Sequence, residues 1–180
     1  MSPDRTDTAP GGRTPAAGRG QRCTAYLLVG GQFAMLGSLV VLPDGMEWPL
    51  PEPARRAAQV AAGGGLVLAA VAASSLGRGA TPLPLPNKRT QLRTGGLYRL
   101  VRHPIYSGVL LFAGGRAAGS GSRPKLLLFV ALVALLTGKA RFEEKQLRGR
   151  FPGYGEYASR TPRFLPGRRR HRSASSGLGR

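Results

Sequence analysis

Two long stretches of the chain contain no charged residue, and they limit what the chain can fold into. The first, residues 24–42, is nineteen residues long, enough to cross a bilayer core of about 30 Å as a helix. It is too long for a cleaved signal peptide, and no small-x-small cleavage site precedes the polar residues 43–45. The second, residues 57–77, is rich in alanine and glycine. We expect it to pack on neighbouring helices through its small side chains.

Two shorter apolar runs follow. Residues 105–115 are apolar up to Arg116, a run that is short for an independent span. Residues 119–124 have the composition of a tight turn, and residues 126–138 form the fourth run. We interpret the third and fourth runs as a helical hairpin that is tilted or does not fully cross. The pattern predicts an all-α, polytopic membrane protein with four apolar helices.

The charge balance is strongly basic, with 27 Lys and Arg against 8 Asp and Glu and a formal net charge of +19. Such a balance raises nucleic acid as a partner. The charges lie in blocks between the apolar runs, however, and the basic stretch 168–172 has no interleaved aromatic residues. We therefore predict no nucleic-acid partner. The lone Cys23 excludes an intrachain disulfide and cannot form a thiolate metal cluster, and we predict no metal site.

Composition divides the chain into three parts. Residues 1–22 have no periodicity and predict a disordered basic arm, and residues 167–180 predict a basic disordered tail. Residues 23–166 form the predicted membrane domain. Within it, residues 78–102 carry six cations and no acid, and the alternating Pro82, Pro84 and Pro86 require extended backbone.

The distribution of Lys and Arg predicts the topology. The segments before the first run, between the second and third, and after the fourth carry four, six and twelve of these residues. The two remaining connections carry two and three. The positive-inside rule therefore places both termini and residues 78–102 in the cytoplasm, in the cytoplasmic membrane if the chain is prokaryotic. The basic loops would meet anionic lipid headgroups there.

The segment 95–108 combines two arginines, a histidine, two tyrosines and a proline at the start of the third run. Proline is favoured at the first position of a helix, so Pro104 predicts a helix start directly after His103. Tyr106 would then lie on the same face, three residues on. The helix N-terminus and the cations favour an anionic small molecule. The structural alternative is a His103 that only bonds nearby backbone.

A second candidate segment follows the fourth run and contains two adjacent carboxylates, Glu143 and Glu144. Adjacent helical positions differ by about 100°, so only one can easily face inward. Glu144 has a favourable i, i+4 partner in Arg148, whereas Glu143 has Lys139 in the less favourable order. Local pairing therefore favours Glu143 as the inward residue. The aromatic residues at 151, 154 and 157 suit interfacial anchors and pocket walls equally.

These motifs together resemble a known family. Gly96-Leu-Tyr-Arg-Leu-Val-Arg-His-Pro-Ile-Tyr-Ser-Gly108, then Glu143-Glu-Lys-Gln-Leu147, then the stretch from Tyr154 to Pro166, are similar to the isoprenylcysteine carboxyl methyltransferases. That group and the related phospholipid methyltransferases are integral membrane enzymes that use S-adenosylmethionine. The resemblance covers roughly residues 80–166 and implies a cytoplasmic C-terminal cofactor-binding segment without a Rossmann domain. The absence of a Gly-rich strand-to-helix signature agrees with this.

The resemblance also implies roles for single residues. The residues that it assigns to cofactor binding are Tyr98, His103, Pro104, Tyr106, Glu143 and Glu144. The resemblance does not distinguish the roles of the two carboxylates. Arg102 and Arg141 are the candidates for holding an acidic acceptor. The implied reaction is methyl transfer to a carboxylate, isoprenylcysteine-like, or to another lipophilic acceptor.

Two further functions stay open. One is a phospholipid or small-lipid N- or O-methyltransferase, because the first two helices and the tails carry no family signature. The other is a non-catalytic membrane protein that binds anionic lipid. Arg116 departs from the usual apolar hairpin of the family, so that helix is shortened there or the arginine extends to the far surface.

Overall fold

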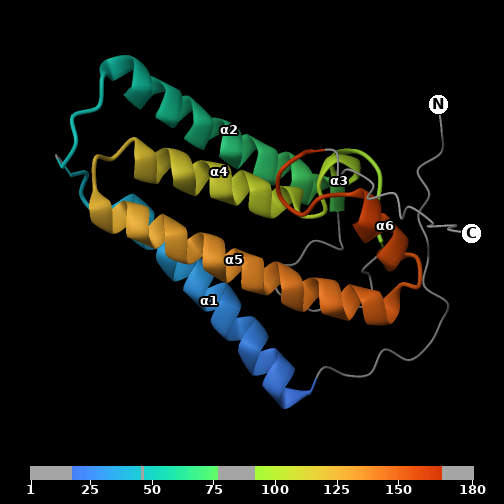
Figure 1. The fold of residues 1–180 in the computed structure, drawn as a ribbon. Coiled ribbons are helices and arrows are strands. Elements are labelled where there is room, and N and C mark those ends of the chain that lie inside the picture. Colours follow the sequence, from blue (N-terminus) through green and yellow to red (C-terminus); the bar gives the residue numbers. More distant parts are fainter. Residues whose placement is uncertain (1–17, 46, 77–91, 168–180) are drawn as a thin grey trace, which may run out of the picture.

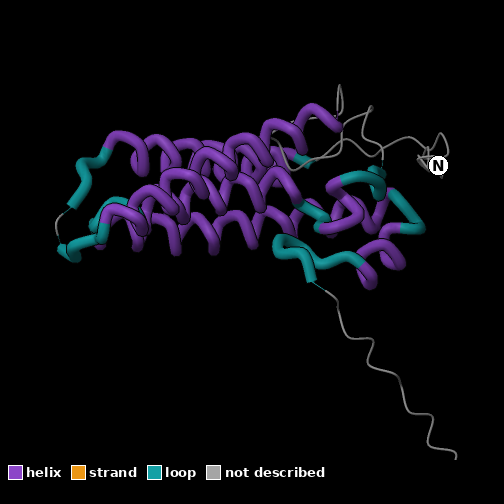
Figure 2. The backbone as a smooth tube through the Cα atoms, turned by 90° about the horizontal axis from the view of Figure 1, so that it is seen from above, coloured by secondary structure: helices purple, strands orange, loops and turns teal. Residues whose placement is uncertain are grey.

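The computed structural model describes residues 18–45, 47–76 and 92–167, and within these ranges it is helical and has no strand. Helix α4 lies between α2 and α5, and α1 packs against α5 and α4 (Figure 1). Figure 2 shows the connecting loops at the two ends of these long helices. The six helices are α1 (Arg19–Val41), α2 (Glu52–Leu76), α3 (Leu97–Leu100), α4 (Pro104–Ala118), α5 (Arg123–Arg150) and α6 (Tyr154–Arg160).

Helices α1 and α2 are long and apolar enough to cross a membrane. Each begins about five residues before the apolar run that predicted it, because polar residues extend the helix beyond the uncharged stretch. The predicted arm 1–22 is wrong at its boundary, since α1 already begins at Arg19. The rest of that arm, the alternating prolines at 82–86 and the basic tail from 168 lie outside the described residues.

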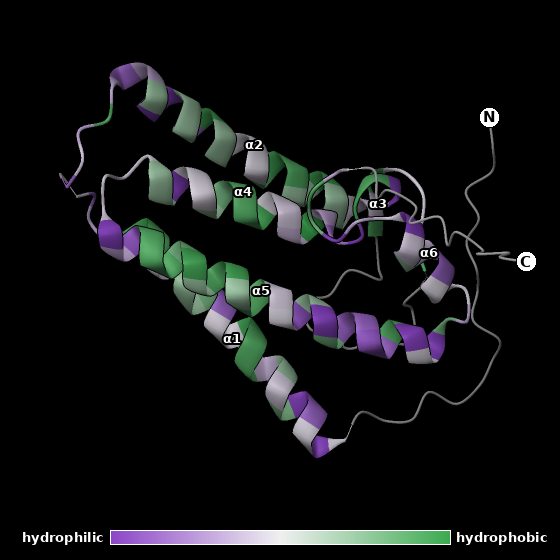
Figure 3. Cartoon of the chain, viewed as in Figure 1, coloured by the Kyte–Doolittle hydropathy of each residue, from purple (hydrophilic) through white to green (hydrophobic). Residues whose placement is uncertain are grey.

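The predicted hairpin is confirmed: α4 and α5 pack together and are joined by the turn at residues 119–122. The alternative that Arg116 shortens α4 is wrong, because the helix continues to Ala118 and the arginine reaches Asp44 at this end. Helix α5 has 28 residues and is thus roughly 42 Å long. It begins with a short hydrophilic stretch, continues with an apolar part and ends in a hydrophilic C-terminal part (Figure 3).

Helices α2 and α4 approach each other closely through glycines. A Cβ atom on Gly65 would lie 2.4 Å from the backbone nitrogen of Phe112, and one on Gly108 would lie 2.6 Å from that of Ala69. Such distances are inside van der Waals contact, so only glycine fits at these two positions. The prediction that the Ala- and Gly-rich helix packs through small faces is confirmed.

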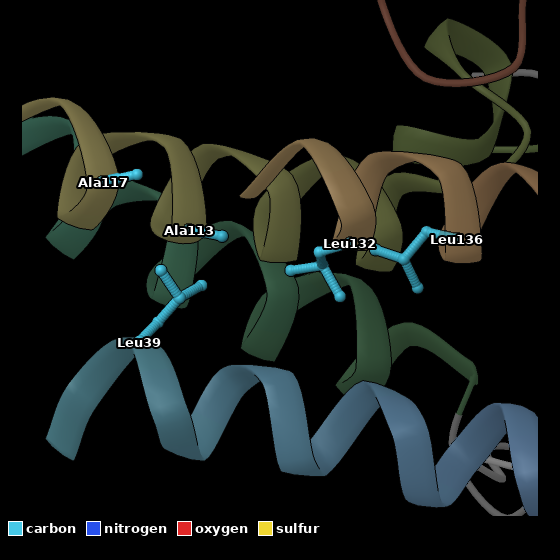
Figure 4. Packing of buried hydrophobic residues seen from close by; sticks show 5 residues of the cluster. All are labelled: Leu39, Ala113, Ala117, Leu132 and Leu136. Atoms are coloured by element: carbon cyan, nitrogen blue, oxygen red, sulfur yellow. The ribbon is translucent and has the colours of Figure 1, made fainter. Parts of the chain in front are cut away.

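The apolar core lies on the other side of α4. It is formed by side chains from α1, α4 and α5 that have no exposed surface (Figure 4). Its fully buried members are Leu39, Ala113, Ala117, Leu132 and Leu136. Alanines on α4 face leucines on the neighbouring helices, so large and small side chains alternate across the contact. This packing fixes α5 relative to α4 and therefore sets where the polar part of α5 lies.

Candidate functional site

A cavity of about 470 Å³ lies at the end of the bundle where α4 begins and α5 becomes hydrophilic. All six helices contribute to its wall. Small-molecule sites are typically cavities of about 300 to 1,000 Å³ that are mostly apolar with a few polar groups. The polar members of this wall are Gln32, Arg93, Tyr98, Arg102, His103, Tyr106, Lys139, Glu143, Tyr154 and Tyr157.

The start of α4 places His103 and Tyr106 on this wall, as the sequence predicted. His103 is the N-cap residue and Pro104 occupies the first turn. The rings of His103 and Tyr106 stack with centroids 5.2 Å apart and an interplanar angle of 1°. The alternative that His103 only bonds nearby backbone is wrong, because both of its ring nitrogens face carboxylates of α5.

Glu144 is the centre of a buried ionic cluster. Its carboxylate lies 3.0 Å from Nη2 of Arg102 and 3.2 Å from Nε2 of His103, and it accepts two hydrogen bonds of 2.9 Å from Arg163. Only 4% of the Glu144 side chain is exposed. These four residues are called the Glu144 cluster below. Three cationic or protonatable side chains thus converge on one acid from two distant segments of the chain.

The electrostatics of this cluster follow from its geometry. Burial alone would raise the pKa of Glu144, but hydrogen bonds from Arg163 and His103 and the charge of Arg102 outweigh it. The pKa of Glu144 is therefore held far below its ordinary value of 4.5. The same hydrogen bond raises the pKa of Arg163. Glu144 is an ionised, structurally committed carboxylate and has no capacity to act as a general base near neutral pH.

Backbone contacts hold the arginine and histidine of the cluster in place. The N–H groups of Arg102 and His103 donate to the carbonyls of Pro162 and Arg163, at 2.9 and 3.1 Å. Nη1 of Arg102 donates to the carbonyl of Ala158 in α6. The segment that follows α6 therefore closes over the start of α4 and brings Arg163 to Glu144.

Glu143 points to a different part of the site. It accepts a 3.0 Å hydrogen bond from the hydroxyl of Tyr106 and lies 3.7 Å from Nδ1 of His103. Its side chain is 31% exposed and lines the cavity. Glu143 is thus the carboxylate available to a ligand, and Glu144 is the one that holds the surrounding chain together.

Two buried polar atoms beside the cavity have no hydrogen-bond partner among the described residues: Nε of Arg102 and the hydroxyl of Tyr154. Both residues line the cavity. Buried polar groups are nearly always hydrogen-bonded, and each unsatisfied one costs about 1 to 3 kcal/mol. Tyr98 and Tyr157 complete this wall, with the Tyr157 hydroxyl donating to the carbonyl of Tyr98 at 2.6 Å. Burial raises the pKa of both tyrosines, so both remain neutral.

The structure also departs from two sequence predictions. The expected surface pair between Glu144 and Arg148 is wrong, because Arg163 and Arg102 occupy the carboxylate and bury it. The inference that one carboxylate must face outward fails for a physical reason: Tyr106 of α4 contacts Glu143, while Arg163, which follows α6, contacts Glu144. Arg141 is exposed and does not line the cavity, so the structure does not bring it to Arg102.

Several site residues were not identified from the sequence. Gln32 and Lys139 form a hydrogen bond of 2.6 Å at the cavity wall. Gln32 lies within the first uncharged run, and Lys139, which directly follows the fourth run, was considered only as a local partner of Glu143. Arg163 lies in the Thr-Pro-Arg stretch that carried the resemblance, where its role was not assigned. The aromatic residues at 154 and 157, which suited anchors or walls equally, are cavity walls.

Comparison with known proteins gives the family. The phospholipid methyltransferase model matches residues 55–152, a range that contains α3, α4 and α5 and most of the cavity wall. The chain belongs to this family. Membership implies a methyltransferase, and together with the two long apolar helices it indicates association with a membrane.

Two curated proteins are similar over part of their length. The cobalt-zinc-cadmium resistance protein CzcN of Cupriavidus metallidurans is 38% identical over 80 residues, which are 44% of this chain and 37% of that protein. The nickel-cobalt-cadmium resistance protein NccN of Alcaligenes xylosoxydans xylosoxydans is 35% identical over 96 residues, 51% of this chain and 43% of that protein. The chain thus spans about two fifths of the length of each relative.

Proposed function

We propose that this chain transfers a methyl group from S-adenosylmethionine to a lipophilic acceptor at the cytoplasmic membrane face, and that the acceptor is a carboxylate. The observation that carries the proposal is the cavity at which the Arg-His-Pro-x-Tyr segment meets Glu143. Phospholipid methyltransferases generally use S-adenosylmethionine, which supplies an electrophilic methyl group on a sulfonium.

The residues on the wall fit this cofactor. A sulfonium cation is stabilised by a carboxylate and by aromatic faces, and the cavity offers Glu143 with Tyr98 and Tyr106. The cofactor also carries a carboxylate and polar ring nitrogens. The unpaired hydroxyl of Tyr154 is a donor suited to such groups. The volume of about 470 Å³ suits a small molecule of this class.

The protein has to position the methyl donor and the acceptor in line and to exclude water from between them. Transfer of a methyl group forms a bond from the acceptor oxygen to the methyl carbon while the carbon–sulfur bond breaks, and the electron pair stays on sulfur. An ionised carboxylate is already nucleophilic, so no base has to remove a proton. Arg102, which Glu144 and the carbonyl of Ala158 hold in place, would orient an acidic acceptor.

Cofactor binding tests the proposal directly. We expect the purified chain in neutral detergent to bind S-adenosylmethionine by calorimetry. Glu143→Gln and Tyr106→Phe should each weaken binding roughly five- to a hundred-fold, because each removes a polar contact worth about 1 to 3 kcal/mol. Glu156→Gln is the matched control, an exposed glutamate that forms a salt bridge with Arg160 and does not line the cavity. No binding by the unaltered chain would refute the function, and unchanged affinity in both variants would make the motif structural.

The chemical nature of the product distinguishes the acceptors. We would incubate membranes that contain the chain with methyl-labelled S-adenosylmethionine and treat the products with base. A methyl ester releases the label as methanol, whereas an N-methylated phospholipid headgroup retains its N-methyl label. If the label is retained after base treatment, the acceptor is an amine and not a carboxylate. A chain that only binds anionic lipid would give no labelled product. The shared two fifths of the relatives is too little to assign metal resistance to this chain.

A further inference from the structure

Lys139 is a buried lysine on the cavity wall. Its exposed fraction is 1%. Its ammonium donates a 2.6 Å hydrogen bond to Oε1 of Gln32 and lies 5.3 Å from the ring centroid of Tyr106. No acidic side chain of the described residues forms a salt bridge with it. Lys139 therefore brings to the cavity a positive charge that no carboxylate of the described residues contacts directly, and Glu143 acts on it only through space.

The energetics of this arrangement point to an external partner. Burying an ammonium is costly unless it is paired and hydrogen-bonded. An amide oxygen and an aromatic face compensate only part of that cost, and two of the three N–H donors are left over. Lys125, the other fully buried lysine of the described residues, shows the contrast, because Asp44 neutralises it. Lys139 is suited to an anion that the described part of the chain does not supply.

The position of Lys139 indicates which ligand would supply that anion. It precedes Glu143 by four residues on α5, about 6 Å along the helix axis. At the level of Glu143 the wall is polar, with His103 and Tyr98. The wall also has apolar members from α1, α2 and α4: Phe33, Leu36, Ala69, Ala73 and Val109. Lys139 thus lies in a cavity that offers both polar groups and apolar surface.

We propose that Lys139, positioned by Gln32, recognises the anionic head of the acceptor, a carboxylate or a phosphate attached to a hydrocarbon chain that lies along the apolar wall. This rests on the proposed function, because it assigns the acceptor to the same cavity. Gln32 belongs to α1, outside the residues 55–152 that match the family. The pair that would recognise the anion therefore joins α5, which lies within the matched residues, to α1, which lies outside them. A helix outside the matched residues is where we expect relatives to differ in their acceptor.

Ligands that share one hydrocarbon chain and differ in the head test this assignment. Native mass spectrometry of the full chain in maltoside detergent would measure the binding of dodecanoate, dodecyl phosphate and neutral dodecanol. The variants are Lys139→Met, Lys139→Arg and Gln32→Leu. The matched controls are Lys145→Met, an exposed lysine of α5, and Gln59→Leu, an exposed glutamine of α2.

We expect Lys139→Met to weaken at least one anionic ligand about ten- to a hundred-fold and to change dodecanol binding by less than about threefold. Lys139→Arg should retain most of the affinity, and Gln32→Leu should lose roughly two- to tenfold for the anions alone. The anion that loses most identifies the source, a carboxylic acid or a phosphate head. The two controls should match the unaltered chain.

Three results would overturn the assignment. One is equal binding of anionic and neutral ligands by the unaltered chain. Another is the same loss for all three ligands in Lys139→Met, which shows a structural role. The third is a loss of S-adenosylmethionine affinity with unchanged alkyl ligands, which places Lys139 at the cofactor. If the unaltered chain binds no S-adenosylmethionine, the proposed function fails, whereas the comparison of heads still decides the role of Lys139.

Discussion

The two ends of the helical bundle each hold a carboxylate among cations, but in opposite ways. At the cavity end, Glu144 is the buried partner, with 4% of its side chain exposed. At the other end, Asp44 pairs with Lys125 and Arg116, and the buried partner is the lysine: the Asp44 side chain is 55% exposed and the Lys125 side chain 0%. The three residues are called the Asp44 cluster.

The difference separates a structural cluster, which only joins segments of the chain, from a cluster beside a binding site. The structural one is called a clasp below. The Asp44 cluster joins the loop after α1 to the start of α5, and backbone bonds between Gly45 and Ser120 and between Glu47 and Gly121 reinforce it. Its charged side chains pair with one another, and these pairs connect segments of the chain. The Glu144 cluster also joins segments, but it leaves Nε of Arg102 unpaired beside a cavity. A hydrogen-bond donor without a partner beside a cavity distinguishes the end that can bind a ligand.

The largest expected effect concerns the sides of the membrane that the two ends face. If the Lys and Arg asymmetry sets the topology, the Asp44 end faces away from the cytoplasm and the cavity end faces it. Reporter fusions at residue 50 and after residue 170 should then report opposite sides. If both fusions reported the same side, the predicted topology would be wrong, and the two clusters would not lie on opposite sides of the membrane.

The next largest effect compares the two acids directly. Glu144→Gln leaves Arg102 and Arg163 without their buried counter-charge, and breaking such a pair costs about 3 to 5 kcal/mol. Asp44→Asn also removes the counter-charge of the buried Lys125, but it should cost less, because Asp44 is half exposed and the amide oxygen can still accept the hydrogen bond from Lys125. Thermal unfolding of the purified chain in detergent measures both. Equal losses would show that burial does not separate the two clusters.

The burial of Glu144 reverses what the local sequence favours, which is Glu143 as the inward carboxylate, and the reason is physical. The preference of proline for the first helical position correctly places His103, Pro104 and Tyr106 at the start of α4, because this signal acts within one turn. The fate of Glu144 depends on Arg163, nineteen residues away, which only the path of α6 brings near. A pattern within one helix therefore offers Arg148 as a partner and contains no sign of the true one. Gln32 and Lys139 are 107 residues apart and were missed for the same reason.

A smaller effect tests the helix contact beside the cavity. Gly65→Ala places a methyl group against the backbone of α4, and overpacking of this kind costs about 1 to 3 kcal/mol. Gly64→Ala is its neighbour and meets nothing within 4 Å, so it should be neutral or slightly stabilising. Because Ala69 and Ala73 line the cavity one and two turns further along α2, Gly65→Ala should also weaken S-adenosylmethionine binding. A Gly64→Ala loss of the same size would contradict the close approach.

The acid limb of stability gives a further comparison. In the folded chain the pKa of Glu144 lies below its ordinary value of 4.5, so the unfolded chain takes up this proton first. Its contribution is therefore complete above about pH 4.5 and is lost as the pH falls toward the folded-state pKa. We expect the unfolding temperature of the unaltered chain to drop more steeply below about pH 4.5 than that of Glu144→Gln. An equally steep drop in the variant would mean that other carboxylates dominate.

The smallest effect is expected at Arg116, the charge that interrupts the third apolar run. Its Nη2 lies 3.8 Å from Asp44, and the two side chains are 34% and 55% exposed. A partly exposed pair at this distance is worth about 0 to 1 kcal/mol, because water competes for both charges. Arg116→Gln should therefore leave the unfolding temperature and the binding of S-adenosylmethionine nearly unchanged. Lys125→Met, which removes the buried member of the same cluster, should alter the unfolding temperature more. If Arg116→Gln instead abolished cofactor binding, the two ends would be coupled through α4, and the Asp44 cluster would be part of the site rather than a clasp.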